Sequence, residues 1–276
     1  MPIVRANGAE IYYEQNGTSG DPVVLIHGSW VDHHSWDLVV PGFARATQTV
    51  AYDRRGHGES SGPPRTRPVR DDASDLAALL EVIDLYPAHL VAHSYGGAVA
   101  LRLAIDRPEM VRSISIHEST FVGLLADDPA SAPEAERLLA GVRALQEIIR
   151  SGEVELAASQ FVDVFSSEPG AWQRLPADVR ATFLRNAPRW AEEFDDPDAF
   201  APDRAACRDL LIPALLTDGS QSPRFLHRIM RALGVLLRNS RVQEIPDVGH
   251  VPHLVRPDQY VGLVGSFLLE RNVPST

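Results

Sequence analysis

The chain is poor in several features that would assign it to a particular class of protein. Cys207 is the only cysteine among 276 residues, which excludes an intramolecular disulfide and any cysteine-based metal site or redox pair. Basic residues are also few, with 26 Lys+Arg against 37 Asp+Glu and a formal net charge of −11. Nucleic-acid-binding domains are normally basic, so we expect no nucleic-acid partner.

Long apolar runs are missing as well. No stretch approaches the roughly 20 apolar residues that a membrane-spanning helix needs. The first eight residues, Met-Pro-Ile-Val-Arg-Ala-Asn-Gly, contain no apolar core of a signal peptide. We therefore expect no membrane partner and a soluble, cytoplasmic protein.

Motifs that bind metals or nucleotides are also absent. The chain contains no His-Glu-x-x-His helix, no Gly-x-Gly-x-x-Gly after a strand and no Gly-rich phosphate loop that ends in Lys-Ser/Thr. The sequence consequently predicts neither a metal ion nor any other cofactor.

What the chain does contain is typical of a globular α/β protein. Hydrophobic residues make up 44% and charged residues 23% of the composition, which is enough for a sizeable core. Short apolar runs bounded by turn residues predict seven strands, at 11–14, 23–26, 49–52, 90–92, 111–116, 211–216 and 242–245. Several of these runs are unbroken, as in parallel strands that are buried on both faces.

Helical periodicity lies between the predicted strands and in one long insertion. It is clearest at 72–83 and in the stretches that begin at Tyr95, Pro223 and Pro257. The segment 120–205 shows helical patches broken by prolines and no strand signal, so we interpret it as a mainly helical cap. The predicted core is then 1–119 together with 206–276.

The segment most informative about chemistry is 90–100, which reads Leu-Val-Ala-His-Ser-Tyr-Gly-Gly-Ala-Val-Ala. An apolar strand runs into Ser94, and small residues then open a helix. A serine hydroxyl becomes a useful nucleophile when a sharp turn exposes it, a base takes its proton and helix N-terminal amides face the developing oxyanion. Small residues two before and two after the serine, here Ala92 and Gly96, allow such a turn.

This segment resembles the nucleophile elbow Gly-x-Ser-x-Gly of the α/β-hydrolase fold superfamily, with Ala92 as a departure at the first glycine. Two further segments match the family: His-Gly-Ser-Trp at 27–30, and Asp-Arg-Arg-Gly-His-Gly-Glu-Ser at 53–60, which resembles a structural turn. The resemblance covers nearly the whole chain and implies a mostly parallel twisted sheet flanked by helices. It also implies an oxyanion hole formed by the amides of Ser29 and Tyr95, with Trp30 and Trp36 as candidate pocket residues.

The family order of serine, acid and histidine places the base late in the chain. His250, in the segment Asp-Val-Gly-His at 247–250, fits that place, and His253 is the alternative. The ordinary pKa of histidine, about 6.5, suits a group that takes and returns a proton near neutral pH.

The acid departs from the common pattern. Where the family usually has Gly-x-x-Asp, this chain has Gly-Ser-Gln-Ser at 219–222. Two carboxylates remain as candidates: Glu118, at the end of the strand that follows the nucleophile helix, and Asp218, directly before Gly219. Some members of the superfamily, including certain dehalogenases and lactone hydrolases, carry the acid at the former place. The resemblance favours Glu118 and leaves Asp218 as the alternative.

These features predict a cofactor-free serine hydrolase that cleaves carboxylic esters or lactones through an acyl-enzyme. Its partner would be a small-molecule substrate, and the sequence carries no indication of oligomeric state. Two alternatives remain open: a carbon–carbon bond hydrolase of the same fold, and a catalytically silent hydrolase-fold binding protein.

Overall fold

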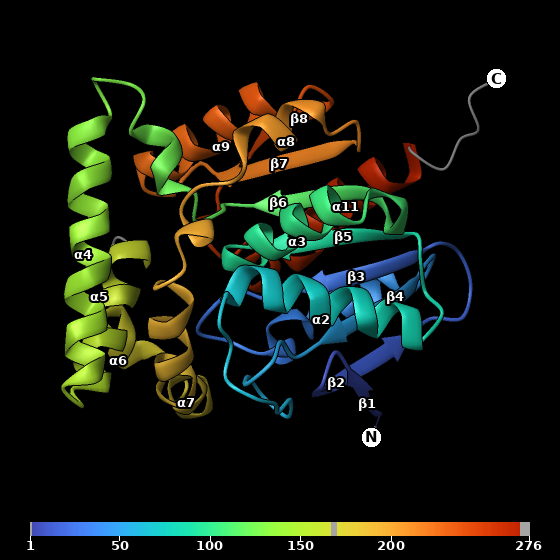
Figure 1. Cartoon of the computed structure of the whole chain (residues 1–276), viewed down its shortest axis with the longest axis horizontal. Helices are drawn as coiled ribbons and strands as arrows, with labels where there is room; N and C mark the ends of the chain where they lie inside the picture. Colours follow the sequence, from blue (N-terminus) through green and yellow to red (C-terminus); the bar gives the residue numbers. More distant parts are fainter. Residues whose placement is uncertain (1, 167–169, 271–276) are drawn as a thin grey trace.

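The structure, a computed structural model, describes residues 2–166 and 170–270. One eight-stranded sheet runs through it in the order β1-β2-β4-β3-β5-β6-β7-β8 (Figure 1). Strands β3 to β8 are parallel to one another, whereas β2 is antiparallel to both of its neighbours, β1 and β4. The predicted fold class is therefore confirmed. The strands are β1 (Ile3–Ala6), β2 (Ala9–Asn16), β3 (Pro22–Ile26), β4 (Gln48–Tyr52), β5 (Ala88–His93), β6 (Val111–His117), β7 (Ala214–Gly219) and β8 (Ser240–Ile245).

The central strands are apolar throughout because helices cover both faces of the sheet. In β3, Val24 and Ile26 pack into the core on the face covered by α2, α3 and α9, while Val23 and Leu25 pack on the face covered by α1 and α11. Alternating side chains of a strand point to opposite faces, so an unbroken apolar run is what two covered faces require. These helices are α1 (Val40–Phe43), α2 (Pro68–Val82), α3 (Tyr95–Asp106), α9 (Arg224–Leu236) and α11 (Pro257–Glu270).

The predicted strands all occur, and two differences have simple causes. Strand β1 was not predicted, because four residues at a sheet edge carry no clear apolar pattern. The strand predicted at 211–216 begins only at Ala214. Pro213 lacks an amide for the ladder, and Leu211 is 76% exposed.

The segment between β6 and β7 contains helices and no strand in its described part. We call α4 (Ala132–Arg150), α5 (Val154–Ser166), α6 (Ala171–Arg174) and α7 (Ala177–Glu193) the insertion helices. Figure 1 shows them gathered at the side of the molecule toward which β3 and β6 point. They share a small core of their own, into which Trp30 inserts from the loop after β3.

Shorter helices connect the main elements. They are η1 (His33–Trp36), η2 (Pro108–Met110), η3 (Val122–Leu125), η4 (Pro197–Ala199), α8 (Arg204–Asp209) and α10 (Pro252–Val255). Among the described helices, none has both the length and the apolar composition to cross a lipid bilayer.

Candidate active site

Ser94 lies at the apex of a sharp turn between β5 and α3. Its backbone has φ 53° and ψ −120°, a conformation that L residues rarely adopt. The turn is possible because its neighbours are small: a Cβ on Gly96 would lie 2.4 Å from the carbonyl oxygen of Ile26, and one on Gly28 would lie 3.3 Å from the Ser94 Cβ. Ala92 is fully buried within β5, so its extra methyl group is accommodated. Ser94 is half-buried and lines a cavity.

His250, on the loop between β8 and α10, lines the same cavity as Ser94. Its Nδ1 lies 2.7 Å from Glu118 Oε2. An ionised carboxylate only accepts hydrogen bonds, so in the neutral ring the proton is on Nδ1 and the lone pair is on Nε2. The chain neighbour of Ser94 fixes this loop, because His93 Nε2 donates to the His250 carbonyl oxygen over 2.8 Å.

Glu118 is buried directly after β6 and is held at both oxygens. Oε2 accepts from His250, and Oε1 accepts from the amide of Gly219 over 2.8 Å. Burial alone would raise the pKa of Glu118, but the electrostatic interaction with His117 and the hydrogen bond from His250 outweigh it and lower the pKa to about 2. The carboxylate is therefore ionised at neutral pH.

Asp218 is one strand away and does not contact His250. Its Oδ2 lies 3.1 Å from His227 Nδ1, on α9. Burial raises the pKa of Asp218 from its ordinary value, and the contact with His227 only partly opposes this effect. Of the two candidate acids, the structure brings only Glu118 to the imidazole of His250.

Gly219 is a functional position that the sequence analysis missed. By its sequence pattern, the segment 219–222 is a place from which an acid is missing, but its first amide donates a hydrogen bond to Glu118. A Cβ on Gly219 would lie 2.5 Å from the carbonyl oxygen of Val248, so only glycine fits there without a shift. The available signal in the sequence was Gly219 itself, a residue without a side chain at a place where no acid follows.

The predicted oxyanion donors, Ser29 and Tyr95, flank Ser94. Ser29 lines the cavity and follows Gly28, which packs against Ser94, while Tyr95 is the first residue of α3. Within the described chain, neither backbone amide donates to a backbone carbonyl. Amides at the start of a helix are suited to an anion because they have no partner within the helix.

Three buried histidines surround His250. The rings of His93 and His117 lie 4.5 Å and 6.5 Å from its ring, and the His253 ring lies 4.8 Å from that of His93. Burial lowers the pKa of His93 and of His253 well below the usual range, and it lowers the pKa of His117 to about 4. His253, the alternative base, packs against Trp36 and does not line the cavity.

The cavity has a volume of about 450 Å³ and a mainly apolar wall. Neither tryptophan proposed as a pocket residue belongs to that wall. Trp36 lies in the core beside α11, and Trp30 stacks on Phe183 and Trp190 of α7. The apolar residues of the wall are Val122, Leu138, Val142, Ala144, Leu145, Phe161, Val164, Phe165, Trp190, Phe194, Phe200, Phe225, Leu226 and Ile229.

Two groups in the described chain have the residue types of a metal site. One is Asp32, His33 and Asp53, and the other is Asp218, His227 and Glu244. In the first group, Asp53 already accepts from the backbone and ring of His33, over 2.8 Å each, which braces the turn at 53–60. The second group lies away from the cavity wall. Neither group contains Ser94 or His250.

Comparison with known proteins identifies a matching protein family and solved structures with a similar fold. A model of the alpha/beta hydrolase family matches residues 23–263. The 2-hydroxymuconate semialdehyde hydrolase of Pseudomonas sp. (strain CF600) is 27% identical over 267 residues, which are 91% of this chain and 88% of that protein. The enol-lactonase from Burkholderia xenovorans LB400 has a similar structure, with a TM-score of 0.77 and 19% identity over 97% of this chain and 100% of that one.

Another relative matches over a shorter length. The dihydrolipoyllysine-residue acetyltransferase component of the acetoin cleaving system of Pseudomonas putida is 36% identical over 112 residues, or 41% of this chain. The match spans only 30% of that protein's length. The family model, in contrast, extends from β3 into α11. With this match and an eight-stranded, mostly parallel sheet, the chain belongs to the alpha/beta hydrolase family.

Proposed function

We propose that this protein is a cofactor-free serine hydrolase that cleaves carboxylic esters or lactones through an acyl-enzyme. One observation carries the proposal: Ser94 and His250 line one cavity, and the Nδ1 of His250 is hydrogen-bonded to an ionised, buried Glu118. This arrangement provides a nucleophile, a base with a free Nε2 and a carboxylate that stabilises the imidazolium.

In the proposed reaction, Ser94 Oγ attacks the ester carbonyl carbon while His250 Nε2 takes the hydroxyl proton. The amides of Ser29 and Tyr95 stabilise the oxyanion, an effect worth about 3–4 kcal/mol per donor in other hydrolases. The C–O bond then breaks, and the leaving alkoxide receives the proton from His250. Water, activated by the same imidazole, attacks the acyl-enzyme and releases the acid.

The wall of the cavity favours a substrate with an apolar acyl or alcohol group. Among the described residues of the wall, Arg137 is the only basic side chain besides His250, and it is exposed on α4. Carbon–carbon hydrolysis of a ring-cleavage product would require a partner for the carboxylate of that substrate. The apolar interior therefore supports an ester or lactone substrate over a ring-cleavage product that carries a carboxylate. This holds although one relative is a 2-hydroxymuconate semialdehyde hydrolase.

The test compares Ser94→Ala with Ser119→Ala. Ser119 lines the same cavity, and its hydroxyl has no hydrogen-bond partner among the residues that the structure describes, so it is a matched control. We expect Ser94→Ala to abolish hydrolysis of a p-nitrophenyl hexanoate ester in a folded protein, and Ser119→Ala to keep it within a few-fold. Undiminished turnover by Ser94→Ala would refute the mechanism.

Two further measurements separate the alternatives. A fluorophosphonate probe should label wild type and not Ser94→Ala, because only an activated serine reacts; absence of labelling in wild type would support a silent binding protein. Product analysis with a plain lactone and a vinylogous diketone, supplied separately, should show turnover of the lactone. Cleavage of the diketone alone would favour the carbon–carbon hydrolase.

A further inference from the structure

The carbonyl oxygens of Gly28 and Ser29, one before and one after the Ser29 amide, both accept hydrogen bonds from side chains. The Gly28 carbonyl accepts from His27 Nδ1 over 2.7 Å and from Arg54 Nη2 over 2.9 Å. The Ser29 carbonyl accepts from His57 Nε2 over 3.0 Å. In a trans peptide the N–H points opposite to the C=O, so fixing the Gly28 carbonyl fixes the direction of the Ser29 amide.

Arg54 also contacts the second oxyanion residue. Its guanidinium carbon lies 4.6 Å from the centre of the Tyr95 ring, in a cation–π arrangement. The Arg54 side chain is fully buried. A single guanidinium therefore contacts the Gly28 carbonyl and the Tyr95 ring, one in each of the two segments that carry the proposed oxyanion donors.

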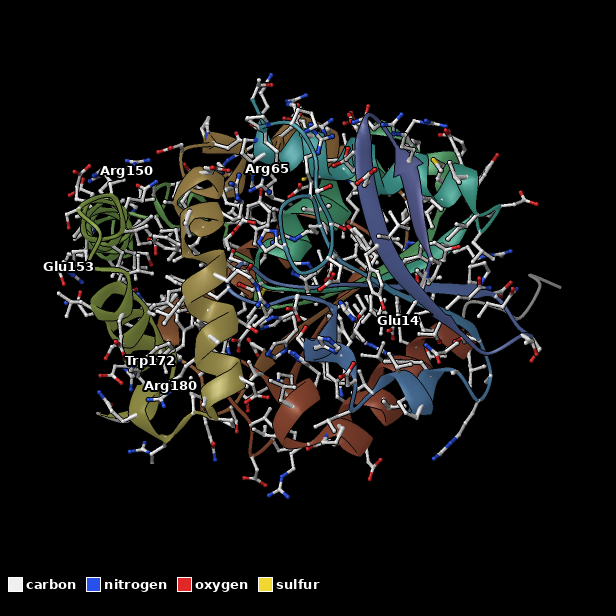
Figure 2. All side chains as sticks on the ribbon, turned by 90° about the horizontal axis from the view of Figure 1, so that it is seen from below. Glu14, Arg65, Arg150, Glu153, Trp172 and Arg180 are labelled. Atoms are coloured by element: carbon white, nitrogen blue, oxygen red, sulfur yellow. The ribbon has the colours of Figure 1, made fainter. Side chains whose placement is uncertain are left out.

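Arg54 is itself held by carboxylates from two elements. Its Nη1 donates to Asp72 of α2 over 2.7 Å and to Glu193, the last residue of α7, over 2.6 Å. Arg65 lies 3.0 Å from Asp72 and 3.6 Å from Glu193, so two positive and two negative charges balance in a buried cluster. In Figure 2, α7 runs from the end near Arg180 to the end beside Arg65. Such a cluster is stable only when every charge keeps a partner.

We propose that Glu193 is a positioning residue: acting through Arg54, it sets the direction of the Ser29 amide and so couples the seating of insertion helix α7 to stabilisation of the oxyanion. This inference rests on the proposed function. Glu193 is the only carboxylate from the insertion helices that bonds to Arg54 in the described chain. When α7 shifts, Arg54 loses one anchor, and the Gly28 carbonyl loses a fixed donor.

The first test is Glu193→Gln, with Asp195→Asn as its matched control. Asp195 follows α7 by two residues and pairs with Arg150 of α4, away from Arg54. We expect Glu193→Gln to lower kcat about tenfold or more, since complete loss of an oxyanion donor lowers it by about 10²–10³. KM should change less than about threefold. Asp195→Asn should keep both values.

An inhibitor pair distinguishes positioning from a general loosening of the cavity. A trifluoromethyl ketone forms a tetrahedral oxyanion with Ser94, whereas an alcohol of the same chain length fills the cavity without charge. In Glu193→Gln the inhibition constant of the ketone should rise in parallel with the fall in kcat, and that of the alcohol should stay constant. An equal rise for both inhibitors would overturn the proposal.

The double variant Arg54→Met with Glu193→Met keeps the test decisive if Glu193→Gln does not fold. It removes one charge of each sign and leaves the Arg65–Asp72 pair intact, and balanced replacement of a buried ion pair by apolar residues is often tolerated. We expect a folded protein with kcat reduced about tenfold or more. Wild-type kcat in this variant would refute the positioning role alone, whereas wild-type turnover in Ser94→Ala would refute the proposed function.

Discussion

Two carboxylates at the ends of neighbouring strands each contact a histidine, but in different surroundings. Glu118 follows β6 and binds His250 on the cavity wall, whereas Asp218 in β7 binds His227 on α9. Both are buried, yet the pKa of Glu118 falls to about 2 while that of Asp218 rises. The difference is in the partners: Glu118 accepts a backbone amide from Gly219 and lies beside His117 as well as His250.

This comparison separates two buried carboxylate–histidine pairs by the place of the histidine and by the hydrogen bonds of the carboxylate. Glu118 pairs with a histidine that reaches the cavity, and its hydrogen bonds favour the ionised form. Asp218 pairs with a histidine of a surface helix, and its burial favours the neutral form. An acid on β6 can serve the His250 loop because this loop passes over β7, where Gly219 packs against Val248 and Gly249.

The largest expected effect comes from removing the charge of Glu118, the carboxylate whose histidine lines the cavity. Glu118→Gln keeps the shape of the side chain but no longer stabilises the imidazolium of His250, and it can hold the wrong tautomer by donating to Nδ1. We expect kcat for the hexanoate ester to fall about 10³–10⁴-fold, as in other serine hydrolases that lose this acid. Steady-state kinetics on the folded variant measures it. A loss of less than tenfold would show that Glu118 is not the acid.

A second expected effect concerns stability at acid pH, because several histidines are buried in the neutral form. Burial keeps the pKa of five histidines below the ordinary value: His27, His57, His93, His117 and His253. As the pH falls below about 6.5, the unfolded chain binds protons at these residues and the folded chain does not. The free energy of unfolding therefore falls with pH, by up to about 1.4 kcal/mol per pH unit for each histidine.

His253→Leu isolates one of these contributions. Urea unfolding between about pH 5 and 6.5 should give a slope smaller than that of wild type by up to about 1.4 kcal/mol per pH unit. At pH 8 the histidine is neutral in both states, so the difference between variant and wild type there gives the packing change alone. Parallel curves for the two proteins below pH 6.5 would contradict the assignment of a buried neutral His253.

The sequence predicted the features that depend on the residues of a single segment. Unbroken apolar runs such as 23–26 indicate burial on two faces, and the small residues around Ser94 indicate a tight turn. The choice between Glu118 and Asp218 depended on which of two strand ends the His250 loop approaches, and no local pattern encodes that. The ion pair of Arg54 with Glu193 joins residues 139 positions apart, so it too became visible only in the structure.

The assignment of Trp30 and Trp36 to the pocket illustrates the same limit. Large aromatic side chains report burial, and both indoles are buried, but their type does not specify which neighbours surround them. Trp36 packs near α11 and Trp30 within the insertion helices, while other aromatic residues, including Phe165, line the cavity. The ring of Phe165 lies 4.5 Å from that of His250.

The smallest expected effect is that of Asp218→Asn, which changes the second of the two carboxylates. The Asp218 carboxylate is bound to His227 and lies outside the cavity wall, so its removal leaves the His250–Glu118 hydrogen bond in place. We expect kcat and KM to stay within about twofold of wild type, as for substitutions outside the reacting groups. Because burial disfavours the ionised form of Asp218, the neutral amide should not lower the thermal midpoint at pH 7. If Asp218→Asn instead lost activity to the extent expected of Glu118→Gln, the acid would belong to β7, and the hydrogen bond from His250 to Glu118 would serve only to hold the loop.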